Sequence, residues 1–149
     1  QRRMCIRDSY NGDFIALEKA HLNKGWKLVD NWHPNNKAGK RNGFVDVPML
    51  EATRPGDRLT LDFRGKAIGI FCISGPSAGI LEYSVDGAPF KELDTFTEWS
   101  HNLYIPWVYM LETELKDTDH KLVLRISKKK NPASQGTECQ IRNFVVNNR

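Results

Sequence analysis

The sequence is poor in cysteine and has no long apolar run. Its cysteines, Cys5, Cys72 and Cys139, do not have the paired spacing of a zinc site, and its four histidines are scattered. No apolar segment approaches the roughly 20 residues that a membrane-spanning helix needs. No glycine-rich loop that could hold a phosphate follows a strand-like run. We therefore expect no metal site, no cofactor and no membrane span.

Cys72 and Cys139 both lie in apolar, strand-like segments. Such cysteines usually behave as small buried hydrophobic residues. In an oxidising compartment the two thiols would instead be able to form a disulfide, which would leave Cys5 without a partner. The sequence leaves both alternatives open.

A concentration of charge of one sign is also missing, since the net charge is only +4. The basic residues form three separate clusters, at residues 2–3, 37–41 and 128–130, and acidic residues accompany the aromatic ones. A nucleic-acid-binding protein usually gathers its basic residues into one stripe with aromatic residues between them. We interpret the clusters as solvated loops and expect no nucleic acid partner.

The length and composition fit one globular domain. The 149 residues include 27% charged and 40% hydrophobic residues, which is enough apolar material for a buried core. The opening residues, QRRMCIRDSY, contain no apolar signal-peptide segment and do not resemble a natural beginning. We expect the chain to be a fragment of a longer protein.

From residue 26 onward, apolar residues recur with a period of two. Residues 58–63 alternate as in a half-buried strand, and residues 67–73 are apolar at every position, as in a strand covered on both faces. Roughly eight such segments separated by turn signals predict an all-β, antiparallel two-sheet sandwich. The residues expected between the sheets are Leu59, Leu61, Phe63, Ile68, Ile70, Leu81, Tyr83, Leu122, Leu124 and Ile126.

Local signals predict the connections. Asp86 and Gly87 tolerate positive φ and predict a hairpin between residues 80–85 and 88–94. A second hairpin is expected between residues 109–115 and 120–127, and a β-bulge near Arg142 and Asn143. Only residues 13–22 have a helical pattern, with Asp13 as a candidate N-cap and Gly25 beyond the end.

Two fragments resemble the catalytic blocks of SGNH/GDSL hydrolases. In that interpretation Ser9 of RDSY is the nucleophile, and His33 and Asp30 of DNWHPN are the base and its orienting acid. However, Arg7 replaces the glycine of the nucleophile turn, and the blocks are far closer in sequence than in that family. We interpret the match as coincidence and keep a stand-alone serine hydrolase as the alternative function.

Residues 97–110, TEWSHNLYIPWVYM, hold half of the tryptophans and tyrosines of the chain. Trp107 and Tyr109 follow Pro106 in a strand-like segment and are expected in the core or in an interface. An exposed connection before the proline is expected to hold the binding candidates Trp99, His101, Asn102 and Tyr104. Their aromatic and polar groups suit a seam against another domain, a carbohydrate site, or local packing.

A resemblance to a known family is carried by residues 25–32, 43–53, 75–87, 99–111 and 130–147. These segments resemble the β-sandwich accessory domain of bacterial, Bacteroidetes-type SGNH/GDSL-like hydrolases, often labelled GDSL-like lipases or acylhydrolases. The resemblance implies a galactose-binding-like jelly roll over residues 25–149, after a lead-in over residues 1–24. It implies a non-catalytic domain beside an SGNH/GDSL catalytic domain of the same polypeptide, in a secreted or periplasmic carbohydrate esterase. Carbohydrate is the alternative partner, and an independent carbohydrate-binding module is the second alternative function.

Overall fold

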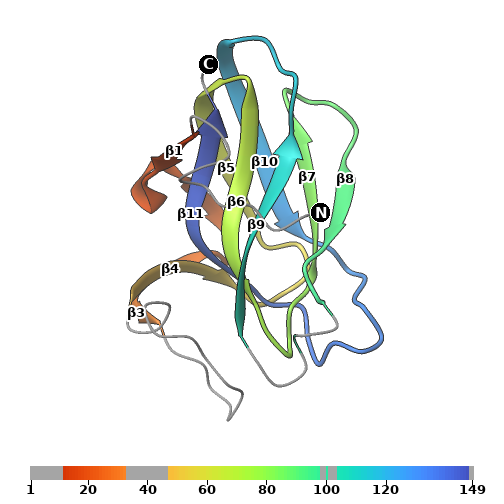
Figure 1. Ribbon diagram of the computed structural model, residues 1–149. Coiled ribbons are helices and arrows are strands. Elements are labelled where there is room, and N and C mark those ends of the chain that lie inside the picture. Colours follow the sequence, from red (N-terminus) through yellow and green to blue (C-terminus); the bar gives the residue numbers. More distant parts are fainter. Residues whose placement is uncertain (1–11, 33–46, 98–99, 101–103, 148–149) are drawn as a thin grey trace.

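Two antiparallel β-sheets pack face to face in the computed structural model, which describes residues 12–32, 47–97, 100 and 104–147 (Figure 1). The elements are β1 (Gly12–Ile15), the 3-10 helix η1 (Leu17–Lys19), β2 (His21–Lys24), β3 (Lys27–Trp32), β4 (Val47–Ala52), β5 (Arg58–Gly65), β6 (Ala67–Ser74), β7 (Ile80–Val85), β8 (Lys91–Asp94), β9 (Ile105–Glu112), β10 (Thr118–Ile126) and β11 (Cys139–Asn147). Within these ranges no helix is long and apolar enough to cross a membrane.

The first sheet has the strand order β3-β4-β11-β6-β9, and β1 pairs with β11 as well. The second sheet has the order β2-β5-β10-β7-β8. All pairs between these strands are antiparallel. The predicted all-β, antiparallel two-sheet sandwich is confirmed.

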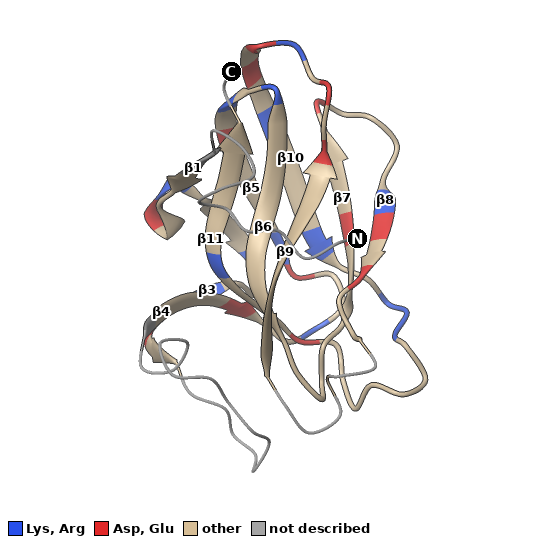
Figure 2. Cartoon of the chain, in the orientation of Figure 1, with Lys and Arg blue, Asp and Glu red and all other residues tan. Residues whose placement is uncertain are grey.

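The core lies between the sheets because each strand turns one apolar face inward. Side chains of β5 alternate between exposed and buried, whereas β6 is buried along almost its whole length. Figure 2 shows β6 without any charged residue, as expected for a strand covered on both faces. The ten predicted core residues all lie in or against this core, with Tyr83 at its margin.

The predicted hairpin at Asp86 and Gly87 is present, and the two residues have φ values of 56° and 77°. The predicted bulge is also present, as a register shift between Ile141 and Asn143 in the pairing of β11 with β6. The extra residue rotates the strand, so that both halves of β11 contribute to the same core cluster.

The helix predicted for residues 13–22 is wrong. Its first residues form β1, and only Leu17–Lys19 form a single 3-10 turn, which is capped by Ala16 without a side-chain hydrogen bond. A helix this short is marginal by itself. As a strand, the same segment forms backbone hydrogen bonds with β11. The segment expected as a lead-in thus contributes β1 to the first sheet and β2 to the second.

The second predicted hairpin is also wrong. β9 pairs with β6 in the first sheet, whereas β10 pairs with β5 and β7 in the second. The connecting residues cross from one sheet to the other over the end of the sandwich. Glu114 adopts a φ of 61°, and the Leu115 N–H donates to the Lys66 carbonyl at 2.8 Å, which ties the crossing to the turn between β5 and β6.

Cys72 and Cys139 are free and buried in the core. Burial raises the pKa of Cys72 to about 12 and raises that of Cys139 well above its ordinary value. Both residues are therefore neutral thiols that pack as small apolar groups. Cys5 lies outside the described residues.

Candidate functional site

Tyr104 does not lie in an exposed connection, so this part of the sequence prediction is wrong. It is 5% exposed, and its ring meets the edge of Trp32 with the ring centroids 5.4 Å apart. Met49 and Ile73 complete this second apolar cluster. Tyr104 is therefore part of the apolar packing between β3, β4 and β6. The other three candidates, Trp99, His101 and Asn102, lie outside the described residues.

Buried hydroxyl groups fix the start of the connection from β8 to β9. The Ser74 hydroxyl donates to the Thr95 carbonyl and lies 2.7 Å from the Ser100 hydroxyl. The Thr97 N–H donates to the Ser100 Oγ at 3.1 Å, and the Thr95 hydroxyl donates to the Gly79 carbonyl at 2.6 Å. These bonds hold Thr95 and Ser100 against β6 and the segment before β7.

β8 and β9 are the terminal strands of the two sheets and lie at the same margin of the sandwich (Figure 1). An ion pair between Lys91 of β8 and Glu112 of β9, 2.8 Å long, ties the two strands together. The same margin contains a cavity of about 300 Å³, which we call the edge cleft. Its lining residues are Leu93, Asp94, Thr97, Trp107 and Tyr109.

Trp107 and Asp94 give the edge cleft an apolar and a polar side. Trp107 is partly exposed, but its indole Nε1 is buried and has no hydrogen-bond partner among the described residues. The exposed part of this ring is therefore hydrocarbon. Asp94 is exposed, and its carboxylate accepts bonds from the Phe96 N–H at 3.0 Å and from the Asn131 side-chain amide at 2.9 Å. The carboxylate is thus held in place while it faces solvent.

Tyr109 lies between the core and the edge cleft. Burial raises the pKa of its phenol group well above the ordinary value, and the negative charge of Asp94 adds to the rise. The phenol group is consequently neutral at physiological pH and carries a hydroxyl donor near the Asp94 carboxylate. The prediction that Trp107 and Tyr109 belong to the core or to an interface is confirmed, since both pack on the main core cluster.

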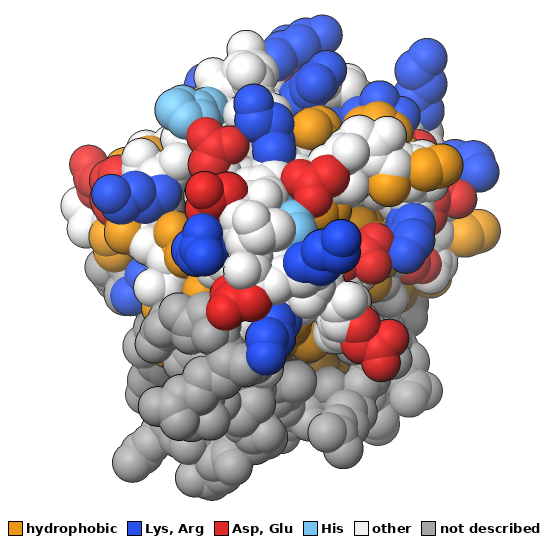
Figure 3. Space-filling view, turned by 90° about the horizontal axis from the view of Figure 1, so that it is seen from above, with side chains coloured by type: hydrophobic (Ala, Val, Ile, Leu, Met, Phe, Trp, Pro, Cys, Tyr) orange, Lys and Arg blue, Asp and Glu red, His pale blue; other side chains and the backbone are white. Residues whose placement is uncertain are grey.

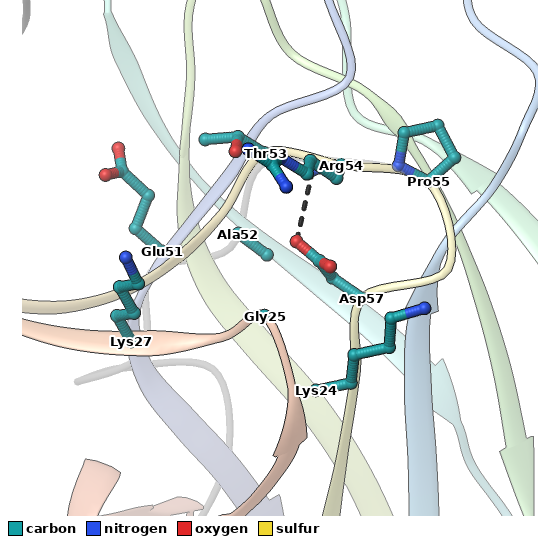
Figure 4. Close-up of a pocket in the computed structure, with 9 residues that line it drawn as sticks. All are labelled: Lys24, Gly25, Lys27, Glu51, Ala52, Thr53, Arg54, Pro55 and Asp57. Atoms are coloured by element: carbon teal, nitrogen blue, oxygen red, sulfur yellow. Dashed lines mark hydrogen bonds between the residues drawn. The ribbon is translucent and has the colours of Figure 1, made fainter.

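A second cavity, of about 540 Å³, lies between the turn after β2 and the connection from β4 to β5 (Figure 4). Its buried Asp57 carboxylate accepts the Arg54 N–H at 3.1 Å. Gly25, with a φ of 76°, packs so closely that a Cβ there would lie 1.9 Å from Asp57 Oδ1. In Figure 4 the amino groups of Lys24 and Lys27 point in different directions. The carboxylate therefore stabilises the turn, and the two lysines do not converge on one ligand.

The structure describes one of the three residues of the alternative hydrolase interpretation. Asp30 is exposed on β3, and Ser9 and His33 lie outside the described residues. Among the described residues there is also no group of three or more potential metal ligands.

Comparison with known proteins finds no matching family model and no matching curated protein. Solved structures with a similar fold include a two-domain esterase active on acetylated mannans, co-crystallised with mannopentaose (TM-score 0.57, 15% identity). The match covers 89% of this chain and 38% of that chain. An exo-β-1,3-galactanase from Phanerochaete chrysosporium, with galactose, matches at a TM-score of 0.56 and 11% identity, over 91% and 29% of the two chains. A family two carbohydrate esterase from Cellvibrio japonicus matches at a TM-score of 0.51 and 11% identity, over 93% and 34%.

At these identities the likeness concerns the fold alone. The chain spans between about a quarter and two fifths of the length of these three proteins. The sandwich is therefore an architecture that carbohydrate esterases and a galactanase contain as one part of a longer chain.

Proposed function

We propose that this chain is a non-catalytic β-sandwich domain of a larger carbohydrate-active protein. The observation that supports this most is the pattern of coverage: nearly the whole chain matches only 38% of an esterase that has two domains and acts on acetylated mannans. The sandwich has its own hydrophobic core, as a separate domain does. In this proposal the catalytic residues belong to the rest of the polypeptide.

The finer proposal is that the larger protein is an exported SGNH/GDSL-type carbohydrate esterase. It is supported by the resemblance of residues 25–147 to the accessory domain of that group. In this proposal the sandwich docks on the catalytic domain of the same polypeptide. The proposed docking residues are Trp99, His101 and Asn102, and the buried Tyr104 packs in the apolar cluster with Trp32. Aromatic residues are favoured at the centre of such interfaces, because they bury a large area with little loss of conformational entropy.

The test uses three proteins: the chain alone, the catalytic domain encoded by the same reading frame, and an equimolar mixture of the two. The chain alone should release no acetate from acetylated mannan or p-nitrophenyl acetate above the buffer blank. The mixture should form a 1:1 complex in size-exclusion chromatography. Trp99→Ala should weaken that complex by tenfold or more, because the loss of a central aromatic residue typically costs at least about 2 kcal/mol.

Phe14→Ala is the matched control, because Phe14 is 51% exposed on β1 and lies outside residues 97–110. It should leave the complex unchanged. Acetate release by the chain alone that disappears in Ser9→Ala would overturn the proposal and establish the hydrolase alternative. Failure of the mixture to associate would overturn the docking role.

A further inference from the structure

The edge cleft has the chemistry that a sugar ring requires. We infer that the edge cleft binds one neutral pyranose unit of a glycan. This inference rests on the proposed carbohydrate-related function. It assigns a ligand to a site outside the proposed docking residues. A pyranose has an apolar face of C–H groups and a rim of hydroxyl groups. Its site therefore needs an aromatic surface beside fixed donors and acceptors.

Trp107 supplies the aromatic surface. Its N–H is buried, so the part of the ring that lines the edge cleft is carbon, which is suited to stacking against C–H groups. Leu93, from the facing strand β8, adds a second apolar contact on the opposite side. Packing against the main core holds the Trp107 ring in place before any ligand arrives, which lowers the entropic cost of binding.

Polar groups lie beside this surface in fixed positions. The neutral Tyr109 phenol is a hydroxyl donor, and the Asp94 carboxylate is an acceptor. Two hydrogen bonds fix the Asp94 carboxylate, but a carboxylate has about four acceptor sites, so two remain for ligand hydroxyls. Thr97 provides a further hydroxyl group, which is oriented by its contact with Ser100 at 2.9 Å.

The charges around the edge cleft favour a neutral sugar. Asp94 is the charged residue in its lining. Lys91 of β8 is paired with Glu112 at 2.8 Å, and Lys129 is paired with Glu92 at 3.4 Å. A uronate or a sulfated sugar in the edge cleft would therefore meet the negative charge of Asp94. A volume of about 300 Å³ is at the lower end of ligand pockets, which fits one ring rather than an extended chain.

Isothermal titration of the isolated chain tests this inference. The ligands are galactose, glucose, mannose and xylose, their neutral oligosaccharides, and glucuronate as the acidic counterpart. At least one neutral sugar should bind with a dissociation constant between about 1 mM and 1 μM, and glucuronate should bind at least about tenfold more weakly. Tyr109→Phe removes only the hydroxyl group and should weaken binding about three- to tenfold, the value of one hydrogen bond.

Trp107→Ala should abolish saturable binding, and Phe14→Ala, which removes an exposed aromatic ring from β1, should leave it unchanged. Because Trp107 also packs on the core, Tyr109→Phe decides the case if Trp107→Ala does not fold. Absence of binding to every neutral sugar would overturn the inference, and so would equal affinity of the parent and Tyr109→Phe. Neither result affects complex formation with the catalytic domain, so failure of this inference is distinguishable from failure of the proposed function.

Discussion

Among single residues, His120 of β10 joins three segments of the sandwich through the contacts of its ring. Figure 3 shows the molecule from above, and acidic and basic side chains are interspersed on that face. His120 is buried against Phe63, and its Nδ1 lies 2.5 Å from Asp86 Oδ2 and its Nε2 lies 2.7 Å from the Lys116 carbonyl. Both ring nitrogens thus face acceptors, which favours the doubly protonated imidazolium. The hydrogen bond to Asp86 raises the pKa of His120, and the Lys116 carbonyl and the Asp119 charge add to the rise.

This geometry predicts pH-dependent stability. The pKa is higher in the folded than in the unfolded chain, so the stabilisation is fully present below the unfolded value of about 6.5 and is lost as the pH rises through the folded value. At pH 5.5 His120→Gln should lower the free energy of unfolding by about 1.5 kcal/mol. This value is at the low end of the range for a charge-assisted hydrogen bond, because the Asp86 side chain is about half exposed and water weakens its interaction with His120. At pH 9 the difference should be smaller.

Urea denaturation of parent and variant at pH 5.5, 7 and 9 measures this effect. Asp86→Asn is the matched control, since asparagine tolerates the positive φ of this position and its amide oxygen can still accept the Lys121 N–H. The amide has no charge and keeps only one of the two acceptor oxygens of the carboxylate, so the charge-assisted bond from His120 is lost. This variant should reduce the same pH dependence. A difference between parent and His120→Gln that stays constant from pH 5.5 to 9 would contradict the assignment of a charged His120.

At the level of elements, the β7–β8 hairpin brings Leu93 and Asp94 to the edge cleft. Its turn is closed by the Ala88 N–H, which donates to the Val85 carbonyl at 3.2 Å, and by the Ser84 hydroxyl, which donates to the Ala88 carbonyl at 2.6 Å. The turn needs positive φ at two successive positions, which is why its sequence is Asp-Gly. The register of the hairpin, and with it the position of Asp94 at the cleft, depends on this turn.

Gly87→Ala tests the turn. Gly87 has a φ of 77°, and a Cβ added there would have no heavy atom within 4 Å, so the substitution introduces backbone strain without a clash. We expect it to lower the free energy of unfolding by about 1 kcal/mol in urea denaturation. Gly87→Asn should cost only a fraction of this, because asparagine enters the left-handed region more easily. Equal stability of the alanine and asparagine variants would contradict a turn of this type.

For the whole molecule, one core between the two sheets determines stability. Strands distant in sequence meet there: β10 lies at the centre of the second sheet between β5 and β7, and β11 lies in the first sheet between β4 and β6. Leu124 of β10 is fully buried, and its cross-strand neighbours are Leu59 and Tyr83. Its side chain is enclosed by other residues, so a shorter side chain at this position would leave a cavity that the neighbouring residues fill only in part.

Leu124→Ala should therefore lower the free energy of unfolding by about 2–5 kcal/mol, the range for a buried leucine that leaves a cavity. Leu22→Ala removes the same atoms from a leucine that is 40% exposed on β2, and should change the stability by no more than about 0.5 kcal/mol. Both values are measured by urea denaturation at one pH. A loss for Leu124→Ala no larger than that for Leu22→Ala would remove Leu124 from the core.

The sequence by itself determined the features that depend on neighbouring residues. Alternation identifies the apolar face of a strand, because successive side chains of a pleated strand point to opposite faces. It correctly placed Leu59, Leu124 and the other predicted core residues, and the phase change in β11 correctly located the bulge. The Asp86-Gly87 pair correctly located a turn, because few residues tolerate positive φ.

The tertiary structure alone decided which strands pair and which surfaces stay open. No local signal shows that β9 and β10 belong to different sheets, because the backbone hydrogen bonds that join strands are the same for every sequence. Tyr104 is buried because it meets Trp32 of β3, a contact between segments far apart in the chain. The edge cleft likewise needs Asp94 from one sheet beside Trp107 and Tyr109 from the other, and only the packing of the two sheets brings these residues together.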